Sequence, residues 1–178
     1  MHSSHSGDLT QLFTERLVLR TWTAAEALAV VNADGHPRPA DWAADFPAEG
    51  DGVIASLLGD HPAWLGAYGH RLIVERAGES VVGSIGLFWP PADGVVEIGY
   101  GIVASRRGEG YATEATRALA AFALATPDVH TVAATVELAN PASVRVLEKA
   151  GFRRLDRTPA EDTDGLAAFG LTRHDLNR

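Results

Sequence analysis

Residues 97–115, which read Glu-Ile-Gly-Tyr-Gly-Ile-Val-Ala-Ser-Arg-Arg-Gly-Glu-Gly-Tyr-Ala-Thr-Glu-Ala, decide the fold of this chain of 178 residues. The first part is apolar, partly β-branched and interrupted by glycine, which predicts a strand with a bulge or a close backbone approach. Two arginines and two glycines then predict a tight turn, and the alanine-rich end predicts a helix. The first N–H groups of a helix have no partner within it and lie at the positive end of its dipole, so the turn predicts an anion site.

Composition excludes several kinds of chemistry. The chain has no cysteine, which rules out disulfides, thiolate metal sites and a cysteine nucleophile, and we expect no metal. The net charge is −8 and no basic run is present, which argues against a nucleic-acid partner and suits a cationic small molecule or peptide. No apolar run is long enough to cross a bilayer, and residues 1–8 do not resemble a signal peptide. We therefore expect a cytoplasmic protein that binds no membrane.

One domain over residues 14–175 is expected, after a frayed segment at residues 1–13. Alternating or β-branched runs predict strands at 16–22, 70–75, 80–88, 95–104, 131–136, 152–155 and 166–171. Capping patterns and apolar periodicity predict helices at 23–35, 52–58, 109–125 and 140–150.

This order predicts an α/β (α+β) fold, with a mixed, mostly antiparallel sheet of about six or seven strands flanked by about four helices. The strand-helix-strand step over residues 95–136 should make its two strands parallel neighbours. The acidic, proline-containing segment at residues 34–62 is open to two readings, a solvated loop or a wall that attracts a cationic substrate.

Two familiar nucleotide motifs do not fit the glycine-rich stretch. No Gly-Lys-Ser/Thr follows the turn, so a Walker site for nucleoside triphosphates is not expected. The glycines at positions 99 and 101 lie inside a predicted strand rather than in the turn after it, which argues against a dinucleotide site.

The motifs together resemble the GNAT superfamily of acyl-CoA-dependent N-acyltransferases. The phosphate-loop pattern of that family, Arg/Gln-x-x-Gly-x-Gly/Ala, is met by Arg107, Gly110 and Ala112. Four further stretches are similar to the branch that contains bacterial ribosomal-protein N-terminal acetyltransferases, namely residues 14–20, 97–100, 110–115 and 140–152. The resemblance covers residues 14 to about 172 and implies a GNAT fold.

The resemblance implies acetyl-CoA as cosubstrate. Backbone N–H groups of the turn would hold the pyrophosphate, and Arg106 and Arg107 would add positive charge. The residues implied for this turn are Arg107, Gly108, Glu109, Gly110, Tyr111 and Ala112. Main-chain groups of Ile102 and Val103 would pair with the pantetheine amides. Asn140 and Ser143 would contact the coenzyme arm, although Asn140 is also a plausible plain helix cap.

The implied chemistry is attack of an amine on a thioester. Because an alkyl amine with a pKa of about 10 is protonated at neutral pH, a base or a water relay must remove a proton. Glu97 is the first candidate for the base, and the alternative is a structural or substrate-orienting carboxylate. Lesser candidates are His70, His130 and Glu137.

The proton donor to the leaving thiolate is less well defined. Many family members have a tyrosine seven residues after the Asn140 position, where this chain has Leu147. Ser143, one turn after Asn140, is the proposed substitute. A thiol with a pKa of about 8.5 also leaves without an enzymic acid, so that alternative stays open.

The sequence therefore predicts an N-acetyltransferase whose acceptor is either a protein N-terminus or a small cationic amine. A non-catalytic acyl-CoA-binding or regulatory module is the alternative. Assembly as a homodimer is left open.

Overall fold

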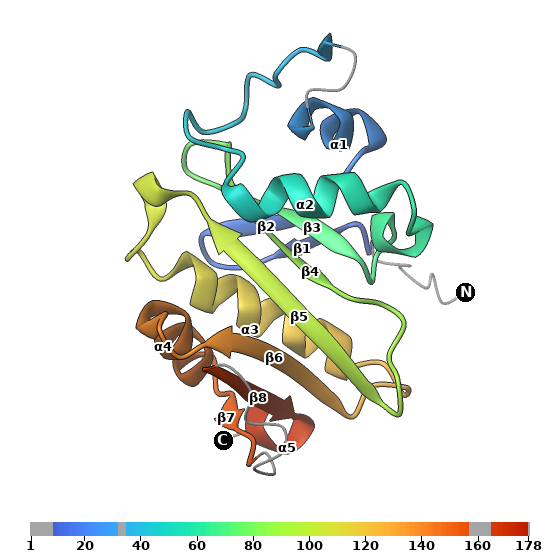
Figure 1. Cartoon of the computed structure of the whole chain (residues 1–178), viewed down its shortest axis with the longest axis vertical. Helices are drawn as coiled ribbons and strands as arrows, with labels where there is room; N and C mark the ends of the chain where they lie inside the picture. Colours follow the sequence, from blue (N-terminus) through green and yellow to red (C-terminus); the bar gives the residue numbers. More distant parts are fainter. Residues whose placement is uncertain (1–8, 32–34, 157–164, 178) are drawn as a thin grey trace, which may run out of the picture.

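The computed structural model describes residues 9–31, 35–156 and 165–177. Within these residues one sheet has the strand order β1-β2-β3-β4-β5-β6-β8-β7 (Figure 1). Its strands are β1 (Gln11–Phe13), β2 (Leu17–Thr21), β3 (His70–Glu75), β4 (Ser80–Leu87), β5 (Val95–Ile102), β6 (Thr131–Glu137), β7 (Arg153–Arg154) and β8 (Leu166–Thr172). The helices are α1 (Ala24–Val30), α2 (Glu49–Leu58), α3 (Tyr111–Leu124), α4 (Pro141–Lys149) and α5 (Arg173–Leu176), with short 3₁₀ turns η2 (Pro62–Leu65) and η3 (Ala104–Arg106).

The predicted mixed, mostly antiparallel sheet is confirmed. Neighbouring strands are antiparallel except β5 and β6, which are joined through α3 and run parallel, as the strand-helix-strand step predicted. The described sheet has eight strands rather than six or seven, because the short edge strand β1 was not predicted. The other edge strand, β7, forms within the predicted range 152–155 but has only two residues. Helix α5, of four residues, was also not predicted.

The prediction that residues 1–13 are frayed is wrong for Gln11–Phe13. Gln11–Phe13 form β1 and pair with β2 from Arg20 to Val18, because a turn at Thr14 folds this short stretch back onto β2. Thr14 accepts a hydrogen bond from the Leu17 N–H at 3.0 Å in that turn. Residues 1–8 lie outside the described part of the chain.

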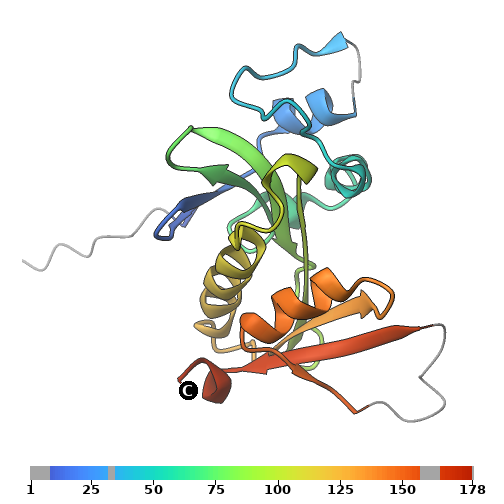
Figure 2. The ribbon, with the colours of Figure 1, turned by 90° about the vertical axis from the view of Figure 1, so that its left-hand side faces the viewer.

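The helices cover opposite faces of the sheet. Ser84 of β4 donates a hydrogen bond to Asp51 of α2, which places α2 on one face. The guanidinium of Arg71 lies 5.2 Å from the ring centroid of Phe122 in α3, and Arg71 aligns with Ile85, the neighbour of Ser84. Since successive side chains of a strand point to opposite faces, α3 covers the other face. Figure 2 shows α2 and α3 on either side of the strands, and α4 packs beside α3.

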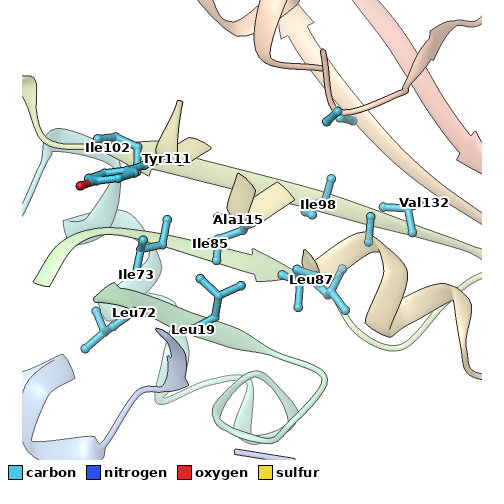
Figure 3. Close-up of a cluster of buried hydrophobic side chains, with 14 of the residues drawn as sticks. Leu19, Leu72, Ile73, Ile85, Leu87, Ile98, Ile102, Tyr111, Ala115 and Val132 are labelled. Carbon is cyan, nitrogen blue, oxygen red and sulfur yellow. The ribbon is translucent and has the colours of Figure 1, made fainter. Parts of the chain in front are cut away.

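A continuous apolar core joins α3 to the sheet. Tyr111 and Ala115 of α3 pack over Ile85 of β4 and over Ile98 and Ile102 of β5 (Figure 3). All five residues are buried, with at most 7% of their surface exposed. This packing fixes the start of α3 against the end of β5, so the turn between them is held by the core.

The two parallel strands separate along their length. β5 and β6 pair only from Val95 to Glu97 and from Thr131 to Ala133. Beyond these pairs β5 continues toward the turn at residues 103–110 while β6 continues toward α4, and the strands diverge (Figure 1). Beyond these pairs the facing edges of β5 and β6 lack a neighbouring strand among the described residues.

Candidate active site

The turn before α3 presents unused backbone donors. Gly108 and Gly110 have φ values of +82° and +83°, a left-handed conformation that favours glycine. Gly110 is the N-cap of α3 and provides no side chain to cap it. In the described structure none of the N–H groups of residues 108–113 donates a hydrogen bond. The predicted anion site at the start of a helix is therefore present in the backbone geometry.

These donors line a cavity of about 1060 Å³ between the turn, α3 and α4. Its wall contains most of the predicted coenzyme residues, namely Ile102, Arg106, Arg107, Gly108, Glu109, Gly110, Tyr111, Ala112, Asn140 and Ser143. The structure thus brings together two segments that are about thirty residues apart in the sequence, as the motifs implied.

Val103 is the exception. It does not line the cavity, and its side chain is 1% exposed. Its N–H donates to the Val82 carbonyl at 2.9 Å, and its carbonyl accepts from the Arg106 N–H at 3.0 Å. The sheet therefore uses the Val103 N–H, and only the second lone pair of its carbonyl is open to a pantetheine amide, so the pairing of Val103 stays a prediction.

The turn between β1 and β2 is bound to the first turn of α3. Glu114 accepts hydrogen bonds from the Thr14 hydroxyl at 2.6 Å and from the N–H of Arg16 at 2.8 Å. The Arg16 guanidinium donates to Glu114 at 2.7 Å and to the Glu109 carbonyl at 2.8 Å. Burial opposes the charge of Glu114, but the hydrogen bonds from Thr14 and Arg16 outweigh it and lower the pKa of Glu114.

A second set of contacts fixes the other side of the turn. The Tyr111 hydroxyl donates to Glu75 of β3 at 2.6 Å, and this hydrogen bond together with burial raises the pKa of Tyr111 to about 12. Glu75 also lies 3.5 Å from the Arg106 guanidinium. Arg107 donates to the Ile102 carbonyl at 3.1 Å. The turn is therefore held in place by side chains while its own N–H groups remain available.

A smaller cavity of about 240 Å³ lies where β5 and β6 diverge. Tyr100, Asn140 and Ser143 line both cavities and form the wall between them. The Tyr100 hydroxyl donates to the Ser143 carbonyl at 3.2 Å, which ties β5 to the first turn of α4. Burial raises the pKa of Tyr100 to about 12, so its hydroxyl stays protonated at neutral pH.

Asn140 is the N-cap of α4, as expected if it serves as a plain helix cap. Its side-chain oxygen accepts the N–H of Ser143 at 3.2 Å, and Pro141 occupies the first helical position. The capped turn faces both cavities, so the cap also fixes where Ser143 lies.

The candidate bases are spread over the sheet. Glu97 is exposed and lies where β5 is still paired with β6. It lines neither cavity. Glu137, at the end of β6, is the one carboxylate in the lining of the small cavity. His70 is 2% exposed, its Nε2 has no hydrogen-bond partner, and burial lowers its pKa to about 4. His130 is exposed and lines neither cavity.

Leu147 is fully buried, so the position where many relatives carry a tyrosine points into the core. The residues that sequence reasoning missed are the clasp, Thr14, Arg16 and Glu114, together with Glu75 and Tyr100. The first three lie within quoted motifs, at residues 14–20 and 110–115, but their pairing across 98 residues or more leaves no local signal.

Among the described residues, no helix has the length and apolarity that a membrane span needs. No group of three His, Asp or Glu side chains in the same residues is arranged to hold a metal ion.

Sequence comparison identifies relatives of this chain. Residues 16–153 match the acetyltransferase (GNAT) domain family. YjdG of Bacillus subtilis, an uncharacterised N-acetyltransferase, is 35% identical over 82 residues, which cover 46% of this chain. The match spans about half, 49%, of the length of YjdG.

Several solved structures share the fold. An acetyltransferase from Agrobacterium tumefaciens strain C58 has a TM-score of 0.65 at 21% identity, over 97% of this chain and 100% of that one. A spermidine N-acetyltransferase chimera of Vibrio cholerae SpeG and hSSAT has a TM-score of 0.65 at 17% identity, over 92% and 100%. A provisionally assigned ribosomal-protein-serine acetyltransferase from Vibrio cholerae has a TM-score of 0.63 at 22% identity, over 91% and 97%. At these identities the likeness concerns the fold.

Proposed function

This chain belongs to the GNAT acetyltransferase family, and from that membership we propose that it transfers an acetyl group from acetyl-CoA to a primary amine. The observation that carries the proposal is the row of unused N–H groups at residues 108–113, which line the large cavity at the positive end of α3. A non-catalytic acyl-CoA-binding module would use the same donors, so the acceptor reaction has to be tested directly.

The residues present fit coenzyme A. The free N–H groups, with Arg106 and Arg107 beside them, suit a pyrophosphate. The large cavity continues from the turn to Tyr100, Asn140 and Ser143, which also line the space between β5 and β6. Bound acetyl-CoA would supply an acetyl group activated as a thioester. The chain would bind the phosphates at α3 and orient the pantetheine arm between the diverging strands.

Proton movement is the second part of the proposal. The acceptor ammonium must lose a proton before its nitrogen bonds to the acetyl carbon, and the carbon–sulfur bond then breaks. Glu97 is proposed as the base, acting directly or through water, because it lies on the strand that leads into the site. After attack the nitrogen loses a second proton, and the Ser143 hydroxyl is proposed to accept that proton as it donates its own to the departing sulfur, because Ser143 lines both cavities.

The acceptor is proposed to be a protein N-terminus or a small cationic amine. Two solved structures of the same fold are described in related terms, one provisionally as a ribosomal-protein-serine acetyltransferase and one as a spermidine N-acetyltransferase chimera. The net charge of −8 favours a positively charged acceptor of either kind.

The test is a panel of primary amines and peptides, including spermidine and a peptide with an N-terminal serine, followed by release of free coenzyme A. At least one acceptor should release coenzyme A in step with its own acetylation. If acetyl-CoA binds but no acceptor in the panel reacts, the non-catalytic alternative replaces the enzyme.

Glu97→Gln and Glu137→Gln then separate the two carboxylates, with Asp128→Asn in an exposed turn as the matched control. Loss of the base should lower the turnover number and flatten its rise with pH, with acetyl-CoA binding retained. Unchanged turnover of Glu97→Gln at every pH would remove Glu97 from this role, and the same profile in Glu137→Gln would remove Glu137.

A further inference from the structure

Positive charge is concentrated in the large cavity. The chain is acidic overall, with 15 basic against 23 acidic residues, yet the cavity wall has more basic than acidic side chains. Its basic residues are Arg16, Arg106, Arg107, Arg117, Arg145 and Lys149, and its acidic residues are Glu15, Glu109 and Glu114. Lys149 is the only lysine of the chain. This reversal of charge points to an anionic ligand.

Half of these cations are already engaged near the turn. Arg16 pairs with Glu114, Arg106 with Glu75, and Arg107 donates to a backbone carbonyl. The other three, Arg117, Arg145 and Lys149, form no ion pair or hydrogen bond within the described residues. They are exposed and therefore accessible to a ligand.

The three free cations come from two helices that pack together. Arg117 is on α3, and Arg145 and Lys149 are on α4, four residues apart and so on one face. Like charges at this spacing repel and slightly destabilise a helix. An anion between the helices would relieve that repulsion, whereas no carboxylate of the described chain does so.

The cluster is separate from the anion site at the turn. Arg117 follows Gly110 by seven residues, which at the rise of an α-helix is about 10 Å along α3. The cavity therefore offers two anion sites, the N–H groups at the start of α3 and the cations further along α3 and α4. Coenzyme A carries two such groups on one ribose, the 5′-pyrophosphate and the 3′-phosphate.

We propose that Arg117, Arg145 and Lys149 bind the ribose 3′-phosphate of coenzyme A and make the protein selective for 3′-phosphorylated coenzyme thioesters. The proposal rests on the proposed function, since it places the pyrophosphate at the turn. It defines the donor class, because carriers that present only the pantetheine arm, or dephospho-coenzyme A, lack the group that these cations bind.

The test is equilibrium binding by titration calorimetry with coenzyme A and dephospho-coenzyme A. The wild type should bind coenzyme A about tenfold more tightly, which is the ratio for roughly one charge-assisted phosphate contact. Arg145→Gln/Lys149→Gln and Arg117→Gln should each reduce that ratio, while the affinity for dephospho-coenzyme A stays within about twofold. Arg154→Gln, an exposed arginine outside the cavity, is the control and should keep the full ratio.

Kinetics give a second readout. The KM for acetyl-CoA should rise in the double variant with little change in kcat, and the rise should diminish at high salt because the contacts are solvent-exposed. A wild-type ratio near one, or an equal loss of affinity for both ligands in the variants, would overturn the 3′-phosphate site alone. Failure of coenzyme A itself to bind the wild type would overturn the proposed function and this proposal with it.

Discussion

Replacing Glu114 with glutamine should loosen the attachment of β2 to the start of α3. The carboxylate accepts three hydrogen bonds, from the Thr14 hydroxyl, the Arg16 N–H and the Arg16 guanidinium. An amide puts an N–H₂ group in place of one oxygen, so at least one donor meets another donor. A hydrogen bond to a charged group contributes about 1.5–3 kcal/mol, but the Arg16 side chain is 43% exposed, which reduces this value.

We therefore expect Glu114→Gln to lower the free energy of unfolding by about 1–2 kcal/mol and the Tm by about 2–8 °C. The measurement is urea unfolding with parallel thermal melts. Glu148→Gln is the control, since Glu148 is exposed on α4 and its side chain forms no described contact.

The pH dependence of stability tests whether Glu114 stabilises the fold in its ionised form. The pKa of Glu114 in the folded protein is below its unfolded value of about 4.3. Its stabilisation is therefore complete above about pH 5 and is lost as pH falls through the folded pKa. The difference between wild type and Glu114→Gln should hold from pH 7 to pH 5 and shrink below pH 4. A loss equal to that of Glu148→Gln, or a difference that persists unchanged at pH 3, would refute the clasp as an ionised contact.

Three further changes probe the fold around the site. Gly86→Ala should be destabilising by about 1–3 kcal/mol, because its Cβ would lie 2.0 Å from Nδ1 of His70. The control Gly101→Ala should be nearly neutral, because its Cβ would meet nothing within 4 Å. Equal free energies of unfolding for the two variants would contradict this packing. Burial lowers the pKa of His70 to about 4, so the unfolded chain binds a proton at this residue more readily than the folded protein. The free energy of unfolding of the wild type, measured in urea, should therefore fall by about 2 kcal/mol from pH 7 to pH 5. The same fall in His70→Leu would show that another group causes this pH dependence. Leu147→Tyr should lower the Tm through overpacking of a fully buried position and leave kcat no higher, and a rise in kcat would show that a tyrosine at this position reaches the reacting sulfur.

The sequence predicted the fold and the anion site because both depend on local patterns. Residues 97–115 read as strand, turn and helix without reference to the rest of the chain, and the structure forms β5, η3 and α3 there. The cap at Asn140 is equally local, since its oxygen reaches a donor three residues on. The missed strand β1 has only three residues, too few for an alternating pattern to be recognised.

Contacts between segments that lie far apart in the chain could not be predicted from the sequence. The pairing of Arg16 with Glu114 and of Tyr111 with Glu75 depends on how the sheet brings β2, β3 and α3 together. The use of both main-chain groups of Val103 depends on the register of β4 and on the η3 turn. Whether Glu97 or Glu137 faces the acceptor likewise depends on where β5 and β6 separate, which a single sequence does not encode in any local motif.

The central claim is that the free N–H groups before α3 hold the pyrophosphate of acetyl-CoA. Titration of the ¹⁵N-labelled protein with acetyl-CoA, followed by amide NMR, observes those groups one by one. The account predicts that the largest shifts fall on the amides of residues 108–113, with smaller changes in the paired part of β5 and in the β1–β2 edge. Saturable binding that leaves these amides unmoved, or no binding at millimolar acetyl-CoA, would contradict it.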